Sequence, residues 1–219
     1  IITGYWRIIQ MSPSIPAISA SYLATTLPAT PGSAGTATIS NTYLNPYTDM
    51  LPVYLSTAYL GPVQQYCKML QYPEVRIEAA ENYLKQTYRN RCTIAAANGP
   101  LSLSVPIIKP DTLKCLTKDI RISDHGNWRH LHWNALVSAY NMSPFFEYYE
   151  EDFAPFYQKK YDFLFDFNEE LRRTVCHLLD LQPNLVYTQE YIPEVANDYR
   201  EIIRPKHEGE DPAFRPKPY

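Results

Sequence analysis

The first apolar segments after residue 50 alternate between strand and helix patterns. Residues 53–59, VYLSTAY, and residues 74–80, EVRIEAA, are short apolar runs typical of buried strands. Residues 61–72 between them have a helical period, and Pro62 suits the first turn because its missing N–H would be unpaired there. The apolar positions of this helix are Val63, Tyr66, Cys67 and Leu70. A strand, a helix and a strand in so short a stretch predict a βαβ unit with parallel pairing.

Two further strand-like segments, 89–97 and 101–108, flank the dipeptide Asn98-Gly99. This dipeptide tolerates the positive φ angles of a tight type I′ turn, so the segments predict a β-hairpin. Residues 118–123, KDIRIS, predict another short strand. Alternation along the first hairpin strand places Arg89, Arg91 and Thr93 on one face and Asn90, Cys92 and Ile94 on the other.

The second half of the chain has mainly helical periodicity. Residues 129–140 lack Pro and Gly, and Pro144 ends that segment. Its apolar face holds His132, Leu136, Ala139 and Tyr140. Aromatic residues continue through 151–167, an amphipathic helix follows over 168–181, and 185–192 resemble a strand. These patterns predict an α/β or α+β fold, with a small mixed sheet and a β-hairpin followed by a helical half.

Residues 1–49 differ in composition from the rest of the chain. They contain two charged residues, Arg7 and Asp49, whereas the remaining 170 residues contain 41. Ser and Thr make up 14 of these 49 positions, and no periodicity is sustained. Such a segment buries too little apolar surface to offset its ordering entropy. We therefore expect a disordered leader, or translated sequence upstream of a start at Met50, before one domain over 50–219.

The overall composition narrows the class of protein. Hydrophobic residues make up 45% and charged residues 20% of the chain, as in globular proteins. The net charge of −3 disfavours a nucleic-acid partner. Apolar runs are shorter than the roughly 18 residues of a membrane span. The four cysteines lack the spacing of a zinc knuckle, which favours reduced thiols in a cytoplasmic protein.

The arginines of the segment YRNRC are the first candidate for chemistry. Arg89 and Arg91 on one strand face would lie roughly 6–7 Å apart. At that spacing, two guanidinium groups can converge on one carboxylate, phosphate or diphosphate. The alternative is an edge strand that its charges protect from aggregation.

The histidines of the stretch DHGNWRHLHWNALVSAY are the second candidate. His132 lies on the apolar helix face, where a neutral imidazole could accept a proton from an attacking amine or hydroxyl. The alternative is a hydrogen-bonded core histidine. A metal site is disfavoured, because His130 and His132 would point about 200° apart around a helix. Cys92 could act as a nucleophile beside His132, although buried thiols are usually inert. No glycine-rich phosphate loop or GxSxG elbow is present, so the motifs name no cofactor.

Several segments together resemble the WbqC-like family, in particular its branch in Bacteroides-type bacteria. They are YLGPVQQY, NYLKQTYRNRC, ANGPLSLSVPI, KDIRIS and SPFFEYYEEDF, with the W-x3-H-x7-Y spacing of Trp128, His132 and Tyr140. The likeness covers about residues 51–181 and continues toward the end of the chain. The family pattern matches Arg89, Asn90, Arg91, Asn98, Gly99, Asp119, Trp128, His132, Tyr140 and Pro144, but not Cys92. Similar proteins continue beyond a K-P-Y stretch into an apolar helix, which implies that a C-terminal helix is missing after Tyr219.

This resemblance implies a role in O-antigen or other surface-polysaccharide biosynthesis. The implied activity is that of an acyl or aminoacyl transferase, of a glycine-transferring type, acting on an amino sugar or a sugar nucleotide. His132 would be the general base, and Arg89 and Arg91 would hold an anionic group. The other expected substrate-binding residues are Asn90, Asn98, Asp119, Trp128 and Tyr140. This hypothesis requires Arg89, Arg91 and His132 to open into one cavity.

Two other classes of function stay open. One is a non-catalytic protein that binds a nucleotide-sugar or an RNA end, because arginines and aromatic residues are interleaved around YRNRC. The other is a protein whose aromatic segment 145–165 forms an interface with a partner.

Overall fold

A parallel sheet forms one half of the protein. The computed structural model describes residues 50–110, 114–205, 211 and 214, so the prediction for residues 1–49 lies outside the described residues. Four strands pair in parallel in the order β5-β2-β1-β6. Their bounds are β1 (Val53–Ser56), β2 (Val75–Glu78), β5 (Leu185–Tyr187) and β6 (Asn197–Asp198). Helix α2 (Val63–Gln71) connects β1 to β2, which confirms the predicted βαβ unit.

An antiparallel β-hairpin belongs to the other half of the protein. Strands β3 (Arg91–Ala96) and β4 (Gly99–Ser104) make a separate antiparallel hairpin. The α/β class is thus confirmed, but the structure contains two separate sheets instead of one mixed sheet. Ala96 pairs with Gly99, so the two central turn residues are Ala97 and Asn98, and neither has a positive φ; Gly99, with a φ of +107°, begins β4. The type I′ prediction is therefore wrong, because that turn needs positive φ at both central residues.

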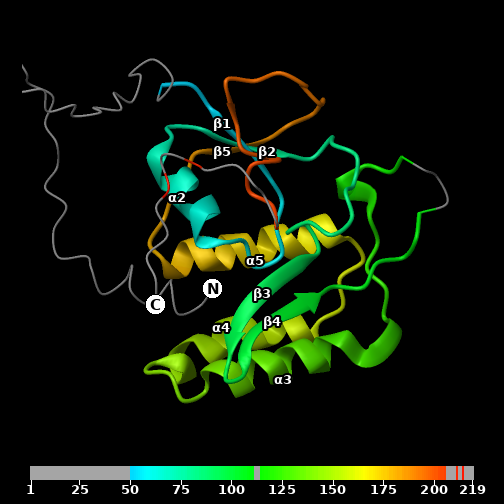
Figure 1. Ribbon diagram of the computed structural model, residues 1–219, viewed down its shortest axis with the longest axis vertical. Coiled ribbons are helices and arrows are strands. Elements are labelled where there is room, and N and C mark those ends of the chain that lie inside the picture. The colour runs from blue at the N-terminus through cyan, green and yellow to red at the C-terminus, as the bar shows by residue number, and fades with distance from the viewer. Residues whose placement is uncertain (1–49, 111–113, 206–210, 212–213, 215–219) are drawn as a thin grey trace, which may run out of the picture.

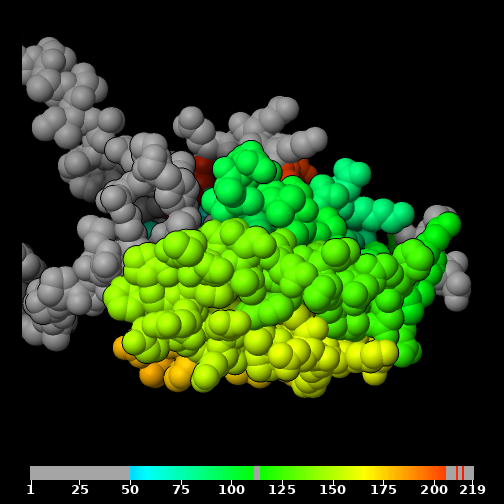
Figure 2. Space-filling view, turned by 90° about the horizontal axis from the view of Figure 1, so that it is seen from below, coloured from blue at the N-terminus to red at the C-terminus, as the bar shows by residue number. Residues whose placement is uncertain are grey.

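Three helices complete the fold. They are α3 (Trp128–Tyr140), α4 (Phe146–Gln158) and α5 (Leu164–Leu178). Helices α3 and α4 lie beneath the hairpin, and α5 crosses between the hairpin and the parallel sheet (Figure 1). Seen from below, α3 and α4 form much of the surface (Figure 2). No helix within the described ranges is long and apolar enough to cross a membrane.

Helix α5 belongs to two hydrophobic cores. Its Leu164, Phe167 and Leu171 pack in the core beneath the hairpin, together with buried residues of α3 and α4. One turn beyond Leu171, Val175 and the adjacent Cys176 pack in the core of the parallel sheet. The helix therefore fixes the position of the sheet relative to the hairpin.

The predicted elements differ from the structure where tertiary contacts set the boundaries. The segment 118–123 is not a strand, because Thr117–Asp119 form a 3₁₀ helix and the following residues make only isolated bridges. The helical segment 151–167 is broken between α4 and α5, where the Ile122 N–H donates to the Asp162 carbonyl at 2.9 Å. The strand at 185–192 covers only its first three residues.

Candidate functional site at the carboxyl ends of the parallel strands

The sheet has a topological switch point between β1 and β6. From β1 the chain proceeds to β2 and then β5 on one side, and β6 adds to the other side of β1. In open parallel sheets, ligands bind outside the carboxyl ends of the strands at such a point. The residues that follow β1, β2 and β6 are therefore the first place to look for chemistry.

Arg89 lies at the centre of a polar cluster at this edge. Its Nε and Nη2 donate to the two carboxylate oxygens of Glu81, each at 2.6 Å. Nη2 also donates to the Ser56 hydroxyl at 2.8 Å and to Glu201 Oε1 at 3.3 Å. Arg89 is only 2% exposed, whereas the side chain of Glu201 is 48% exposed. One buried guanidinium thus holds two carboxylates, of which only Glu201 reaches solvent.

A second buried network lies beside the first. The Arg200 Nη1 donates to Glu78 Oε2 at 2.8 Å, and its Nη2 donates to Asp198 Oδ2 at 2.6 Å. The Thr188 hydroxyl donates to the other oxygen of Glu78. Arg200 and Glu78 are fully enclosed, so both networks place paired charges at the ends of parallel strands.

Opposite charges balance in the Arg89 cluster. Burial is the largest influence on Glu81 and raises its pKa, while the hydrogen bonds from Arg89 lower it. Burial lowers the pKa of Arg89, but its bonds to Glu81 and the charge of Glu201 raise it by more. Two carboxylates, Glu81 and Glu201, thus face two guanidinium groups, because Glu201 also forms an ion pair with Arg204.

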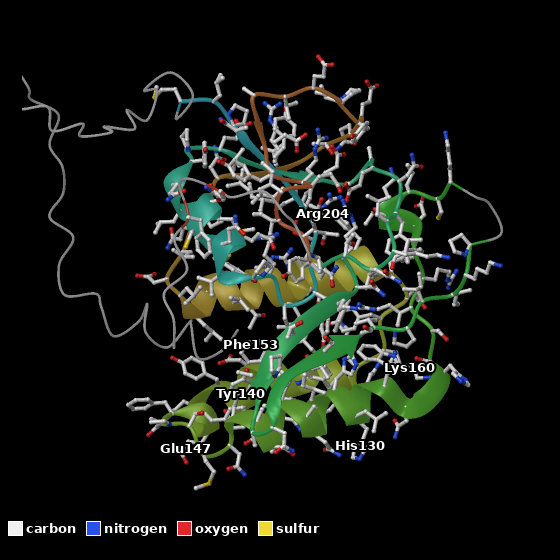
Figure 3. The ribbon with its side chains drawn as sticks, in the orientation of Figure 1. His130, Tyr140, Glu147, Phe153, Lys160 and Arg204 are labelled. Atoms are coloured by element: carbon white, nitrogen blue, oxygen red, sulfur yellow. The ribbon has the colours of Figure 1, made fainter. Side chains whose placement is uncertain are left out.

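A small cavity opens between these elements. It has a volume of about 10 Å³, close to the space that one water molecule needs. The ends of β1 and β6, helix α2 and the segment before Arg89 line it through Leu55, Ser56, Thr57, Ala58, Gln65, Tyr88, Arg89, Tyr199 and Ile203. The cavity is too small for a ligand of sugar size. Glu201 is not among its lining residues; its side chain is 48% exposed and forms an ion pair with Arg204 at 3.2 Å. Arg204 is labelled above α5 in Figure 3.

The two predicted arginines do not act as a pair. The chain enters β3 only at Arg91, so the strand alternation does not extend to Arg89. Arg91 is half-buried, and its Nε donates to the Ser104 hydroxyl at 3.1 Å across the hairpin. Arg89 instead turns toward Glu81. The expectation that both guanidinium groups lie on one strand face is therefore wrong. The common cavity required of Arg89, Arg91 and His132 is not formed either: Arg89 bonds to Glu81, Arg91 to Ser104 and the buried His132 to Tyr59. The transferase is not supported in that form.

His132 is buried in a hydrogen-bonded chain. Its Nδ1 lies 2.9 Å from the Tyr59 hydroxyl, which lies 3.0 Å from the Tyr157 hydroxyl. Burial lowers the pKa of His132 to about 4, although a hydrogen bond with the Ser104 backbone raises it. A neutral imidazole has one donor and one acceptor nitrogen, and both are used here. The geometry is that of a core histidine that positions Tyr59, and it does not support the predicted role of general base.

The remaining predicted residues are distributed over both halves. Asn90 donates to the Val105 carbonyl at 3.1 Å. Trp128 packs edge-on against His132, and the Tyr140 hydroxyl accepts from the Ala95 N–H at 3.1 Å beside the hairpin (Figure 3). These three side chains thus hold the hairpin and α3 in place.

Two predicted polar residues lie apart from the Arg89 cluster. Asn98 is exposed at the hairpin turn, and Asp119 is exposed at the end of a 3₁₀ helix. Within the described residues, no side-chain hydrogen bond or ion pair joins either of them to Arg89, Arg91 or His132. By contrast, His130 projects from the outer side of α3, where its Nε2 lies 3.0 Å from Nδ2 of Asn134 (Figure 3).

Cys92 is fully buried, and burial raises its pKa to about 12. A thiol in this state is neutral at physiological pH and supplies little nucleophile. In the described residues, no group of three potential metal ligands lies close enough to hold an ion.

Sequence reasoning missed the carboxylates. Glu78 lies within the second predicted strand, 74–80, and is the last residue of β2; Glu81 follows directly after the predicted strand. Acidic residues directly after a strand of a βαβ unit are a usable signal, because the carboxyl ends of parallel strands form one edge. No local pattern in the sequence points to Glu201, because it lies near Arg89 only after β6 has paired with β1.

Comparison with known proteins identifies a family. No curated protein and no solved structure shows a significant match to this chain. A sequence model of the WbqC-like protein family matches residues 58–207, which include every strand and helix of the structure except β1. The chain therefore belongs to the WbqC-like protein family.

Proposed function

We propose that this protein is an acyl or aminoacyl transferase, of a glycine-transferring type, that acts on an amino sugar or its sugar nucleotide. The reaction would serve the synthesis of O-antigen or another surface polysaccharide, a context with which the family is loosely associated. The observation that carries the proposal is the position of Glu201 and Glu81 on one guanidinium at the switch point of the sheet.

The chemistry of acyl transfer requires a base near the acceptor amine. The amine nitrogen attacks the carbonyl carbon of the donor, a C–N bond forms, and the bond from that carbon to the leaving group breaks. The proton released from nitrogen passes to a base, for which we assign the exposed carboxylate of Glu201. General-base assistance of this kind contributes roughly 10²–10⁴ in rate.

The other members of the cluster would position the base. Arg89 fixes Glu201 from below, while Glu81 and Ser56 hold the guanidinium in place. His132 would act on the cluster only indirectly, through its hydrogen bond with the hydroxyl of Tyr59, a residue that follows β1. The Tyr59 N–H donates to the Tyr88 carbonyl, next to Arg89, at 2.8 Å. His132 is thus a positioning residue in this proposal.

A screen with a matched variant tests the proposal. The purified protein is incubated with amino sugars or their nucleotide derivatives and with aminoacyl or acyl donors, and mass spectrometry detects the acylated sugar. We expect Glu201→Gln to lower turnover by about 100-fold or more while binding of the acceptor changes little. Glu151→Gln, an exposed change on α4, is the control and should leave turnover intact.

Two outcomes would contradict the proposal. One is full turnover by Glu201→Gln, which would show that Glu201 is not the base of the transferase. The other is saturable binding of a sugar nucleotide without turnover with any donor class, which would instead support the non-catalytic binding alternative.

A further inference from the structure

A second and larger cavity lies between the C-terminal half of α5 and strand β5. It has a volume of about 370 Å³, within the range of small-molecule pockets. Arg172 and Arg173 contribute its cationic side together with the polar ring of His177, and Leu181, Pro183 and Leu185 contribute its apolar side. We propose that this cavity binds a phosphate-bearing small molecule with an apolar body, at a site separate from the Glu201 cluster.

Arg172 is the main reason for this assignment. It is 8% exposed, and its Nε donates to Glu169 Oε2 at 2.7 Å. Among the residues that the structure describes, its Nη1 contacts the Cys176 thiol at 3.9 Å, and its Nη2 contacts the Tyr187 hydroxyl at 3.4 Å, with no other hydrogen-bond acceptor. A guanidinium has five N–H donors, and these two contacts are long and weak. Cys176 and Tyr187 also line the cavity, so the under-used donors lie at its wall.

The guanidinium of Arg172 stays charged at this wall and is paired with the buried Glu169. Burial lowers the pKa of Arg172, but the carboxylate of Glu169 raises it by more. Burial raises the pKa of the Cys176 thiol, which therefore adds no negative charge. A charged guanidinium whose Nη groups make only weak contacts at a cavity wall can donate to an anionic ligand.

The rim of the cavity adds to this preference. Arg173 and His177 are exposed, one helical turn apart on α5, and Arg173 has no ion-pair partner among the residues that the structure describes. Asp180 opposes them as the one carboxylate in the lining. The carbonyl groups at the C-terminus of α5 should repel an anion only weakly, because two of them already accept hydrogen bonds. The donors are the Asp180 N–H at 3.0 Å and the Leu181 N–H at 2.8 Å.

Phosphate fits these groups better than carboxylate does. A phosphate has more charge and more acceptor oxygens than a carboxylate, so it can make better use of donors from both Arg172 and Arg173, which line the cavity. The apolar wall lies opposite and would receive an uncharged portion of the ligand. The site is independent of the proposed acceptor site, although Glu169 also accepts from the Thr57 hydroxyl near the end of β1 at 2.9 Å.

Calorimetric titration with inorganic pyrophosphate at constant ionic strength tests the inference. We expect saturable binding that Arg173→Gln weakens by about tenfold or more, because each hydrogen bond between charged groups contributes substantially to affinity. Acetate should bind far more weakly. Arg121→Gln, which removes an exposed arginine beside the hairpin, is the matched control and should leave the affinity unchanged.

Two results would overturn the site. One is no binding of pyrophosphate at millimolar concentration. The other is an equal effect of Arg173→Gln and Arg121→Gln, which would show attraction to surface charge in general. Glu201→Gln should leave pyrophosphate affinity unchanged, so failure of this site and failure of the transferase proposal are distinguishable.

Discussion

Arg89 and Glu81 form a buried bidentate ion pair, with both nitrogen–oxygen distances at 2.6 Å. Removing one member would leave the other charge without its partner in a desolvated site. We expect Arg89→Met to lower the free energy of unfolding by about 3–5 kcal/mol. Urea denaturation followed by circular dichroism measures this loss.

The matched control for that variant is Arg121→Gln, whose exposed ion pair with Asp162 spans 3.6 Å. It should cost less than about 1 kcal/mol. The double variant Arg89→Met/Glu81→Leu should recover much of the stability, because no buried charge is left unpaired. Equal losses in Arg89→Met and the control would contradict the role of Arg89 in the core.

The buried imidazole of His132 predicts a pH dependence of stability. Its pKa is lowered from 6.5 to about 4, so the unfolded chain takes up this proton first as the pH falls. The stability that the neutral ring contributes is thus complete above about pH 6.5 and is lost progressively toward pH 4, by about 3 kcal/mol in total. Unfolding midpoints in urea at several pH values measure this slope.

The variant His132→Gln removes the titrating group. It should unfold at lower urea concentration at pH 7 and show a shallower dependence on pH between 4 and 6.5. His130→Gln, at an exposed position of the same helix, should keep the slope of the parent protein. A slope that His132→Gln leaves unchanged would assign the acid sensitivity to other groups.

Gly61 leaves room for a neighbouring side chain. A Cβ atom at this position would lie 2.3 Å from Oε1 of Gln65, whose Nε2 donates to the Ser56 carbonyl at 2.9 Å. Gly61→Ala should displace Gln65 and cost about 1–3 kcal/mol, because the Ser56 carbonyl loses its donor. Thermal unfolding measures this change. In a Gln65→Ala background the added methyl group should cost much less, and an unchanged cost there would refute the steric cause.

Cysteine reactivity should follow burial. Cys92 and Cys176 are buried, whereas Cys67 and Cys115 are half-exposed. With iodoacetamide at mildly alkaline pH, mass spectrometry should find Cys67 and Cys115 modified before Cys92, whose pKa is raised to about 12. Cys92→Ala should retain any transferase activity. Rapid labelling of native Cys92 would show instead that the hairpin opens readily.

The local patterns of the sequence predicted most of the elements. The βαβ unit, the hairpin and helix α3 follow from periodicities of two and 3.6 residues, which depend on neighbouring residues alone. The end of helix α4 could not be predicted from these periodicities. It depends on a tertiary contact, the bridge between Arg121 and Phe163 in the segment that separates α4 from α5.

The candidate site could be predicted only in part. Arg89 was identified as an important residue, but two of its partners, Ser56 and Glu201, lie 33 residues before it and 112 residues after it. No spacing in the sequence shows such pairings. His132 was placed correctly on an inward face, but its partner Tyr59 lies 73 residues away, and that hydroxyl occupies the nitrogen needed for catalysis.

The sharing of α5 between both cores has a consequence for cooperativity. Leu171 and Val175 lie one turn apart on α5 but pack in different cores, so unfolding of the hairpin half or of the sheet half removes packing from the other. The described structure should accordingly melt in a single transition, and neither half, expressed as a fragment without α5, should fold by itself.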